Sequence, residues 1–127
     1  AAWRAATATI APAWADAALL DRPTAVPWAV LSGRDMLAIY TNEVTVHTWD
    51  LATAIGAEVA WDPDVLAASF AAIQAQMPAE HRAEILAAVL AQAPEGATGE
   101  VPFALAVDVP ADAPLIDRLV AWNGRQP

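Results

Sequence analysis

The sequence predicts a mainly α-helical protein with a short strand and a helix near its C-terminus. The first observation is residues 32–56, where apolar residues recur at three- and four-residue steps between two capping signals. The second is the aspartate–proline pair at residues 62–63, a strong signal for the start of a helix. The third is the alternation of apolar residues over 101–109, which has the two-residue period of a half-buried strand.

Residues 32–56 form the longest predicted helix. Ser32 is the expected N-cap, Asp35 completes a start that resembles a capping box, and Gly56 is the expected stop. The β-branched residues at 44–46 favour a strand, but the capped helical frame around them is longer. The apolar residues of the expected half-buried face are Met36, Ile39, Tyr40, Val44, Leu51 and Ile55.

Two segments precede this helix. Residues 1–20 are rich in alanine and predict a helix that bends or breaks near Pro12, because proline cannot donate a backbone hydrogen bond. The prolines in residues 21–27 predict a loop, and residues 26–31 predict a short extended segment that leads into the long helix.

Four further elements follow it. We expect a helix from Asp62-Pro63 to about Met77, and a second helix over about 79–91, because the residue before Pro78 is disfavoured in a helix. A flexible loop at 94–99 leads to the strand at 101–109. The last helix is expected to begin with Asp112 as its cap and to end at Gly124. The apolar residues along it are Leu115, Ile116, Leu119, Val120 and Trp122.

Composition limits the function. A chain of 127 residues with a formal net charge of −9 has the length of one domain and lacks the basic face that nucleic acid or an anionic membrane requires. It contains no cysteine, which excludes disulfides, thiolate ligands and cysteine nucleophiles. No apolar run is long enough to span a membrane, and no glycine-rich phosphate loop or zincin motif is present. The predicted location is the cytoplasm.

Glu43 and His47 form the candidate functional site. They are four residues apart on the predicted helix, so their side chains lie on one face within reach of a shared metal ion or of each other. Without further information, a surface hydrogen bond and a metal site are both open. Asp50 lies three residues beyond His47, where it accepts a bond from the imidazole of a metal-bound histidine or instead anchors the helix through a backbone amide or an arginine.

The remaining charged candidates have two interpretations each. His81 is flanked by charged residues, which favours a solvated surface over a third metal ligand. Arg34, Arg118 and Arg125 are candidates for holding the carboxylate of a substrate, but in so acidic a chain an intramolecular ion pair is the more common role.

Two motifs resemble a known family. The segment NEVTVHTWDLATAIG is similar to the E-x-x-x-H-x-W-D-L-A segment of actinobacterial metal-binding proteins related to mycothiol-dependent maleylpyruvate isomerase, within the DinB-like superfamily of four-helix bundles. The tail VPADAPLIDRLVAWNGRQP is similar to the family ending, a strand followed by D-R-L-(L/V)-A and G-R-D-P, with Gln126 in place of the usual aspartate. The two matches bracket the chain from about Trp14 onward.

The resemblance implies a fold and a metal site. Residues 1–127 would be a single domain, the C-terminal portion of a DinB-like bundle whose N-terminal helices are missing, so that the bundle is incomplete. Glu43 and His47 would be metal ligands and Asp50 would support His47, while the third ligand would be a histidine in the missing segment. Zinc is the first expectation for the metal, with nickel and iron as alternatives.

The resemblance also implies an activity, which the residues alone do not. A low-molecular-weight thiol such as mycothiol would bind at the metal, lose its proton and attack an electrophilic substrate, as in a thiol-dependent transferase or isomerase. The competing interpretation is a non-catalytic helical module for binding or assembly that has a vestigial metal site. A homodimer is left open.

Overall fold

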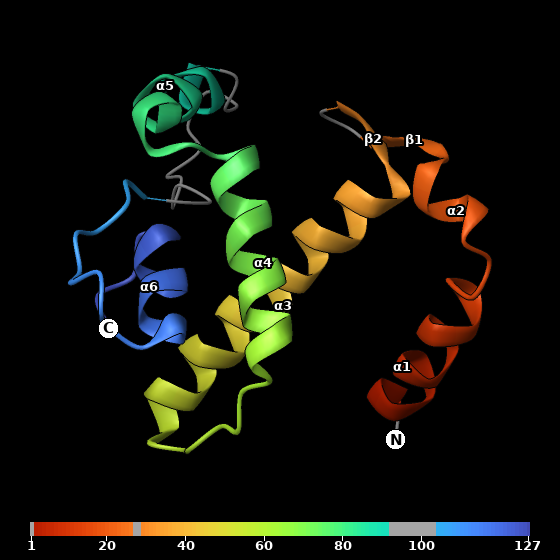
Figure 1. Ribbon diagram of the computed structural model, residues 1–127, viewed down its shortest axis with the longest axis horizontal. Helices are drawn as coiled ribbons and strands as arrows, with labels where there is room; N and C mark the ends of the chain where they lie inside the picture. Colours follow the sequence, from red (N-terminus) through yellow and green to blue (C-terminus); the bar gives the residue numbers. More distant parts are fainter. Residues whose placement is uncertain (1, 27–28, 92–103) are drawn as a thin grey trace. The chain divides into compact units, whose positions relative to one another are not determined.

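The computed structural model describes residues 2–26, 29–91 and 104–127, and this part of the chain is mainly helical, as predicted (Figure 1). The chain divides into two compact units, residues 1–38 and 39–127, and the boundary falls inside the longest helix. No helix in the described ranges has the length and apolar character needed to cross a bilayer. That the chain is one domain, a portion of a DinB-like bundle, stays a prediction. The helices are α1 Ala2–Ala13, α2 Ala18–Asp21, α3 Gly33–Ile55, α4 Pro63–Gln76, α5 Arg82–Ala91 and α6 Leu115–Trp122, with a 3₁₀ turn η1 at Ala79–His81 and strands β1 Pro23–Val26 and β2 Ala29–Ser32.

The N-terminal unit contains a break and a hairpin. The first helix ends one residue after Pro12, which confirms the predicted interruption. Strands β1 and β2 pair antiparallel, with Thr24 opposite Leu31. The predicted loop over 21–27 is therefore wrong for Pro23–Val26, because these residues find a partner strand in the extended segment after them. Residues 27–28 lie outside the described residues.

Local capping determines both ends of α3. Ser32 Oγ accepts a hydrogen bond from the Asp35 backbone N–H at 3.1 Å and donates one to Asp35 Oδ2 at 2.7 Å. At the other end Gly56 has a φ of 64°, in the left-handed region that glycine tolerates best. This turn lets the Ala57 N–H reach the carbonyl of Ala52 at 2.9 Å. The predicted caps are confirmed, since each depends only on neighbouring residues.

The predicted buried face of α3 is largely wrong. Tyr40, Val44, Leu51 and Ile55 are all more than half exposed. The face opposite them is the one covered, because α4 and α6 pack there. It carries polar as well as apolar side chains, so apolar spacing alone selected the wrong side. Its buried members are Asn42, Thr45, Val46 and Ala52.

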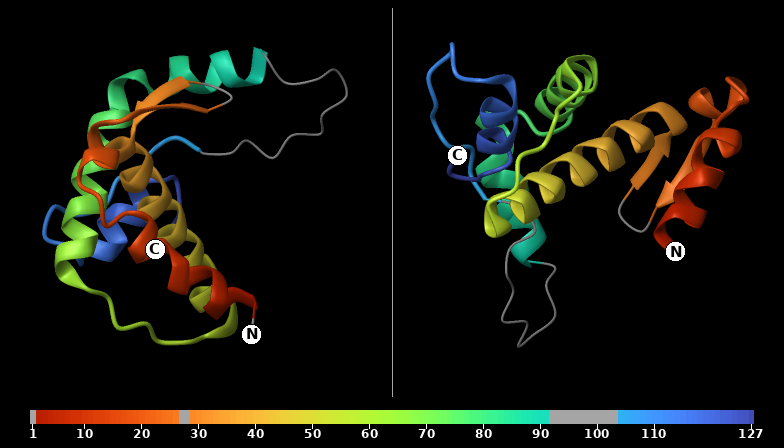
Figure 2. Two further views of the ribbon diagram at one scale, coloured as in Figure 1. Left: turned by 90° about the vertical axis from the view of Figure 1, so that its right-hand side faces the viewer. Right: turned by 90° about the horizontal axis from the view of Figure 1, so that it is seen from below.

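The core of the C-terminal unit lies where α3, α4 and α6 meet. Figures 1 and 2 show α6 beside α4, and the ring of Phe70 on α4 meets that of Trp122 on α6 edge-on, with centroids 6.0 Å apart. Trp49 of α3 packs against the same cluster. The α4 helix begins as predicted, with Asp62 Oδ1 accepting from the N–H of Asp64 at 2.9 Å. The buried cluster consists of Val46, Leu66, Phe70, Ile73, Leu119 and Val120.

Arg82 joins the ends of α4 and α6. Its guanidinium donates to the backbone carbonyls of Met77 (3.0 Å), Trp122 and Ala104 (3.4 Å). The side chain is 1% exposed, and burial lowers the pKa of the guanidinium. Met77 and Trp122 lie at helix C-termini, where the macrodipole is negative and a cation is stabilised. Arg82 therefore acts as a shared C-terminal cap.

Two predictions near the C-terminus are wrong. Residues 104–109, the described part of the predicted strand 101–109, are not in a strand, because their neighbour is a helix: the Val107 N–H bonds to the carbonyl of Ala121 at 2.9 Å. Asp112 does not cap the last helix, which begins at Leu115 with Pro114 at the N-cap and no side-chain cap. The predicted loop at 94–99 lies outside the described residues.

Candidate functional site

Glu43, His47 and Asp50 lie along one side of α3, as their spacing predicts. His47 Nε2 is 3.5 Å from Glu43 Oε2, and His47 Nδ1 is 3.1 Å from Asp50 Oδ2. The side chains of Glu43 and His47 are 55% and 65% exposed, so both are accessible from solvent. The imidazole thus has a carboxylate on each side, one turn toward the N-terminus and one turn toward the C-terminus of the helix.

Asp50 is held from its other side by Arg125. Arg125 Nε donates to Asp50 Oδ1 at 3.2 Å, and one terminal nitrogen donates to Asp50 Oδ2 at 3.0 Å. The hydrogen bond from Arg125 lowers the pKa of the Asp50 carboxyl, partial burial opposes it, and the charge of Arg125 and the bond to His47 act in the same direction as the first. Asp50 therefore meets both an arginine and His47, which the sequence left as alternatives.

The residues after α6 place Arg125 beside α3. Gly124 has a φ of 82° and ends the helix in a Schellman turn, with the Arg125 N–H bonded to the carbonyl of Val120 at 3.0 Å. A Cβ at Gly124 would lie 2.7 Å from the Cβ of Ala104, so the position also requires the absence of a side chain. The second terminal nitrogen of Arg125 donates to the Asn123 carbonyl at 2.8 Å.

A buried amide pair ties α6 to α3. The side chains of Asn42 and Asn123 exchange two hydrogen bonds of 3.0 Å each, and Asn123 also donates to the carbonyl of Leu119 at 2.9 Å. The local sequence pattern does not predict this pair. The available signal was Asn42 itself, a polar side chain four residues before Val46 and seven before Trp49 on the same helix face, where a buried amide requires a partner.

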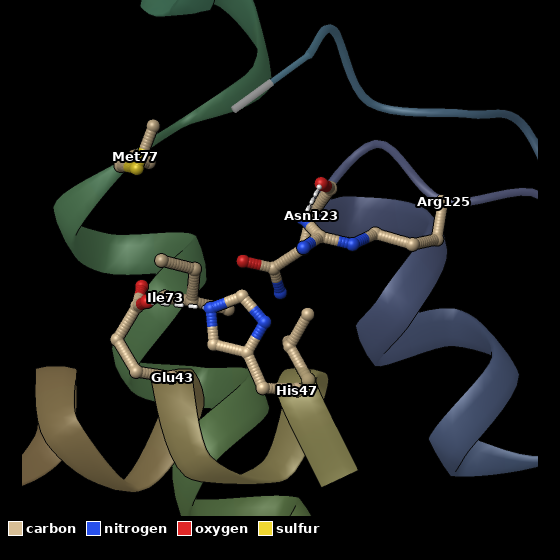
Figure 3. A pocket seen from close by; sticks show the side chains of 7 residues that line it. Glu43, His47, Ile73, Met77, Asn123 and Arg125 are labelled. Atoms are coloured by element: carbon tan, nitrogen blue, oxygen red, sulfur yellow. Dashed lines mark hydrogen bonds and ion pairs between the residues drawn. The ribbon is translucent and has the colours of Figure 1, made fainter. Parts of the chain in front are cut away.

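A small pocket opens beside His47. Its volume is about 130 Å³, and Figure 3 shows the imidazole between Glu43 and the Asn123–Arg125 segment, with Ile73 of α4 and Met77, the residue after α4, across from it. A cavity of similar size accommodates a benzene molecule. One side of the pocket is polar and carries Glu43 and His47, and the other side is apolar and carries Ile73 and Met77. Its lining residues are Glu43, Val46, His47, Ile73, Met77, Asn123 and Arg125.

Glu43 and His47 are the residues here that would hold a metal. Within residues 2–26, 29–91 and 104–127, no group of three or more histidines, cysteines, aspartates or glutamates is arranged to bind one. His81 does not complete such a group; its side chain is 61% exposed and lies 3.7 Å from Glu84, as expected of a solvated surface. The metal site at Glu43 and His47 therefore stays a prediction.

The other candidate arginines differ in their surroundings. Arg34 pairs with Asp21 at 3.6 Å on an exposed surface, and Arg118 lies over the ring of Phe70 at 5.2 Å. Arg125 is occupied by Asp50. For Arg34 and Arg125 the intramolecular ion pair is the observed role.

Comparisons with protein-family models, with curated proteins and with solved structures found no match. The resemblance to the DinB-like family thus stays a prediction from the two motifs.

Proposed function

We propose that this protein binds a divalent metal ion through Glu43 Oε2 and His47 Nε2. The observation that carries the proposal is their separation of 3.5 Å. Two donors at zinc-ligand distances on a tetrahedral ion lie about 3.4 Å apart. The same separation exceeds the range of about 2.7–3.2 Å for an N–H···O hydrogen bond. The spacing therefore suits a shared ion better than a direct bond.

The support given to His47 favours the same role. Histidines that bind metals usually donate their other ring N–H to a carboxylate, and Asp50 lies 3.1 Å from His47 Nδ1. Imidazole with carboxylate suits zinc first, and nickel or iron as alternatives. Metal sites with an open position use about three protein ligands. The site would therefore need a further donor besides Glu43 and His47.

For the chemistry, we propose a DinB-like, thiol-dependent transferase or isomerase. A bound divalent ion would supply Lewis acidity that deprotonates a coordinated thiol, such as mycothiol. Glu43 and His47 would hold the ion. Ile73 and Met77 would shield it from water and would contact the aliphatic part of the thiol or of an electrophilic substrate. The absence of cysteine is compatible with a nucleophile that comes from the small molecule.

The experiment measures metal uptake by the chelator-stripped protein. We expect about one equivalent of Zn²⁺ by elemental analysis, and at least a tenfold weaker affinity in Glu43→Gln and in His47→Gln. His81→Gln is the matched control, because His81 also lies beside a glutamate, Glu84, on an exposed surface. Wild-type protein that takes up no zinc, nickel or iron would refute the proposal. So would an equal loss of affinity in His81→Gln.

The second candidate function is a non-catalytic assembly module. Tyr40, Val44, Leu51 and Ile55 are spaced four, seven and four residues apart, so they share one exposed face of α3. Contiguous exposed apolar residues of this kind often mark interfaces. Sedimentation equilibrium of the wild type and of Leu51→Glu tests it: a dimer that the substitution dissociates supports assembly, and a wild-type monomer at all concentrations opposes a homodimer.

A further inference from the structure

The contacts of Arg125 go beyond a surface ion pair. Each of its three side-chain nitrogens donates a hydrogen bond, two to the two oxygens of Asp50 and one to the backbone carbonyl of Asn123. The side chain is 25% exposed and that of Asp50 is 35% exposed, so the pair is partly shielded from solvent. A two-bond fork between guanidinium and carboxylate constrains the orientation of the carboxylate as well as its position.

The orientation of Asp50 acts directly on His47. Asp50 Oδ2 receives one bond from Arg125 and lies 3.1 Å from His47 Nδ1. An ionised carboxylate can only accept hydrogen bonds, so this contact requires the imidazole proton on Nδ1. With Nδ1 protonated, Nε2 carries a lone pair, and this nitrogen lies on the side of Glu43.

Glu43 competes for the same proton. The charge of Arg125 makes Asp50 a weaker acceptor, which by itself would favour a proton on Nε2 directed at Glu43. The distances decide the other way: 3.5 Å from Nε2 to Glu43 lies beyond the usual hydrogen-bond range, whereas 3.1 Å from Nδ1 to Asp50 lies within it. The proton therefore lies on Nδ1, where it is donated to Asp50, and not on Nε2 toward Glu43.

We infer that Arg125 is a positioning residue that, through Asp50, holds neutral His47 in the tautomer with Nδ1 protonated and Nε2 free to bind a ligand. Its own place depends on an adjacent glycine and on a distant side chain: the left-handed Gly124 turns the backbone after α6, and the Asn42–Asn123 pair holds that end of α6 against α3. The consequence for metal binding rests on the proposed function. The inference about the tautomer does not depend on the proposed function.

The test uses long-range ¹H–¹⁵N correlation spectra of the imidazoles in the metal-free full chain. The spectra are recorded at a pH at which the imidazoles are neutral, because each neutral tautomer has a distinct pattern. The chain has two histidines, so His81→Gln assigns the signals. We expect His47 to be protonated mainly on Nδ1 in the wild type and to shift toward Nε2 protonation in Arg125→Met, with partial restoration in Arg125→Lys.

Two further variants complete the design. Arg34→Met is the matched control, since Arg34 also pairs with an aspartate but in the N-terminal unit, and it should leave the His47 pattern unchanged. Asp50→Asn removes the carboxylate itself and replaces Arg125→Met in the test if that variant does not fold. A wild-type His47 protonated on Nε2, or a folded Arg125→Met protein with an unchanged His47 pattern, would overturn the inference. If Arg125→Met does not fold, an unchanged pattern in Asp50→Asn would overturn it.

A zinc titration separates this inference from the proposed function. Loss of an outer hydrogen-bond partner typically weakens metal affinity about 10–100-fold, and we expect this range for Arg125→Met. If the wild type shows the expected tautomer but binds no metal, the proposed function fails and the positioning role stands. If it binds metal with His47 protonated on Nε2, the positioning role fails.

Discussion

Replacing Arg82 tests how the C-terminal unit is held together. Arg82 is 1% exposed, and within the described residues its guanidinium donates to three backbone carbonyls and not to a carboxylate. Arg82→Met keeps a long apolar side chain but removes every donor. The carbonyls of Met77, Trp122 and Ala104 would then lose a partner that bridges two helix ends and a connecting segment.

Two opposing effects determine the magnitude. Hydrogen bonds from a charged donor contribute about 1.5–3 kcal/mol each, so losing three costs roughly 4–9 kcal/mol, toward the lower end because the Met77 carbonyl keeps a bond from the Trp122 indole N–H at 3.1 Å. Methionine also avoids the desolvation of a buried cation, which offsets several kcal/mol. Loss of the contact between the guanidinium and the Trp122 ring, 5.6 Å from its centroid, adds about 1 kcal/mol. We expect a net loss of about 3 kcal/mol, a large part of the 5–15 kcal/mol typical of a domain.

The assay is urea unfolding followed by tryptophan fluorescence, because Trp49, Trp61 and Trp122 pack against the core cluster. Arg82→Lys should fall between the variant and the wild type, since a lysine has donors at a single point instead of a fork. Arg34→Met, at an exposed ion pair, should change stability by no more than about 0.5 kcal/mol. An Arg82→Met protein as stable as the wild type would refute the reasoning, because the desolvation cost of the buried guanidinium would then equal the free energy that its contacts contribute.

Other substitutions test single contacts by the same unfolding measurement. Ser69→Ala should stabilise the protein by about 1 kcal/mol, because the buried Ser69 hydroxyl has no hydrogen-bond partner among the described residues and alanine favours the helix; a loss of stability would indicate a further hydrogen bond. Asp62→Ala should destabilise it by about 1 kcal/mol through loss of the α4 N-cap, and Asp62→Asn should retain most of the cap. Gly124→Ala should destabilise it by more than 1 kcal/mol because of the positive φ and the 2.7 Å approach to a neighbouring Cβ; unchanged stability would contradict both. Arg125 lowers the pKa of Asp50 below its ordinary value of 3.8, so their interaction stabilises the fold fully above that pH and is lost as pH falls through the folded-state pKa. The stability difference between wild type and Arg125→Met should therefore shrink below pH 3.8, and a constant difference would argue against the pair.

Burial in this protein departs from the local sequence pattern where it depends on distant segments. Arg82 belongs to a charged stretch that predicts a solvated surface, and His81 beside it is indeed exposed. Arg82 is buried because the ends of α4 and α6 converge on it, which no local pattern encodes. The alternation at 101–109 likewise predicts a strand, but Val107 bonds to a helix within the described part of that segment.

Short-range geometry is what the sequence by itself determined. The cap at Ser32, the start at Asp62, the stop at Gly56 and the approach of Glu43 to His47 all follow from residues at most a few positions apart, because one helical turn has a fixed shape.

The tertiary structure alone decided which face of α3 is covered and what stands behind the candidate site. Arg125 meets Asp50 across 75 residues, and Asn123 meets Asn42 across 81. The sequence shows each of these residues as a polar group that needs a partner if it is buried, but the choice of partner depends on how α6 packs against α3. That packing is set by the buried cluster as a whole, since apolar burial is non-directional and no single residue specifies it.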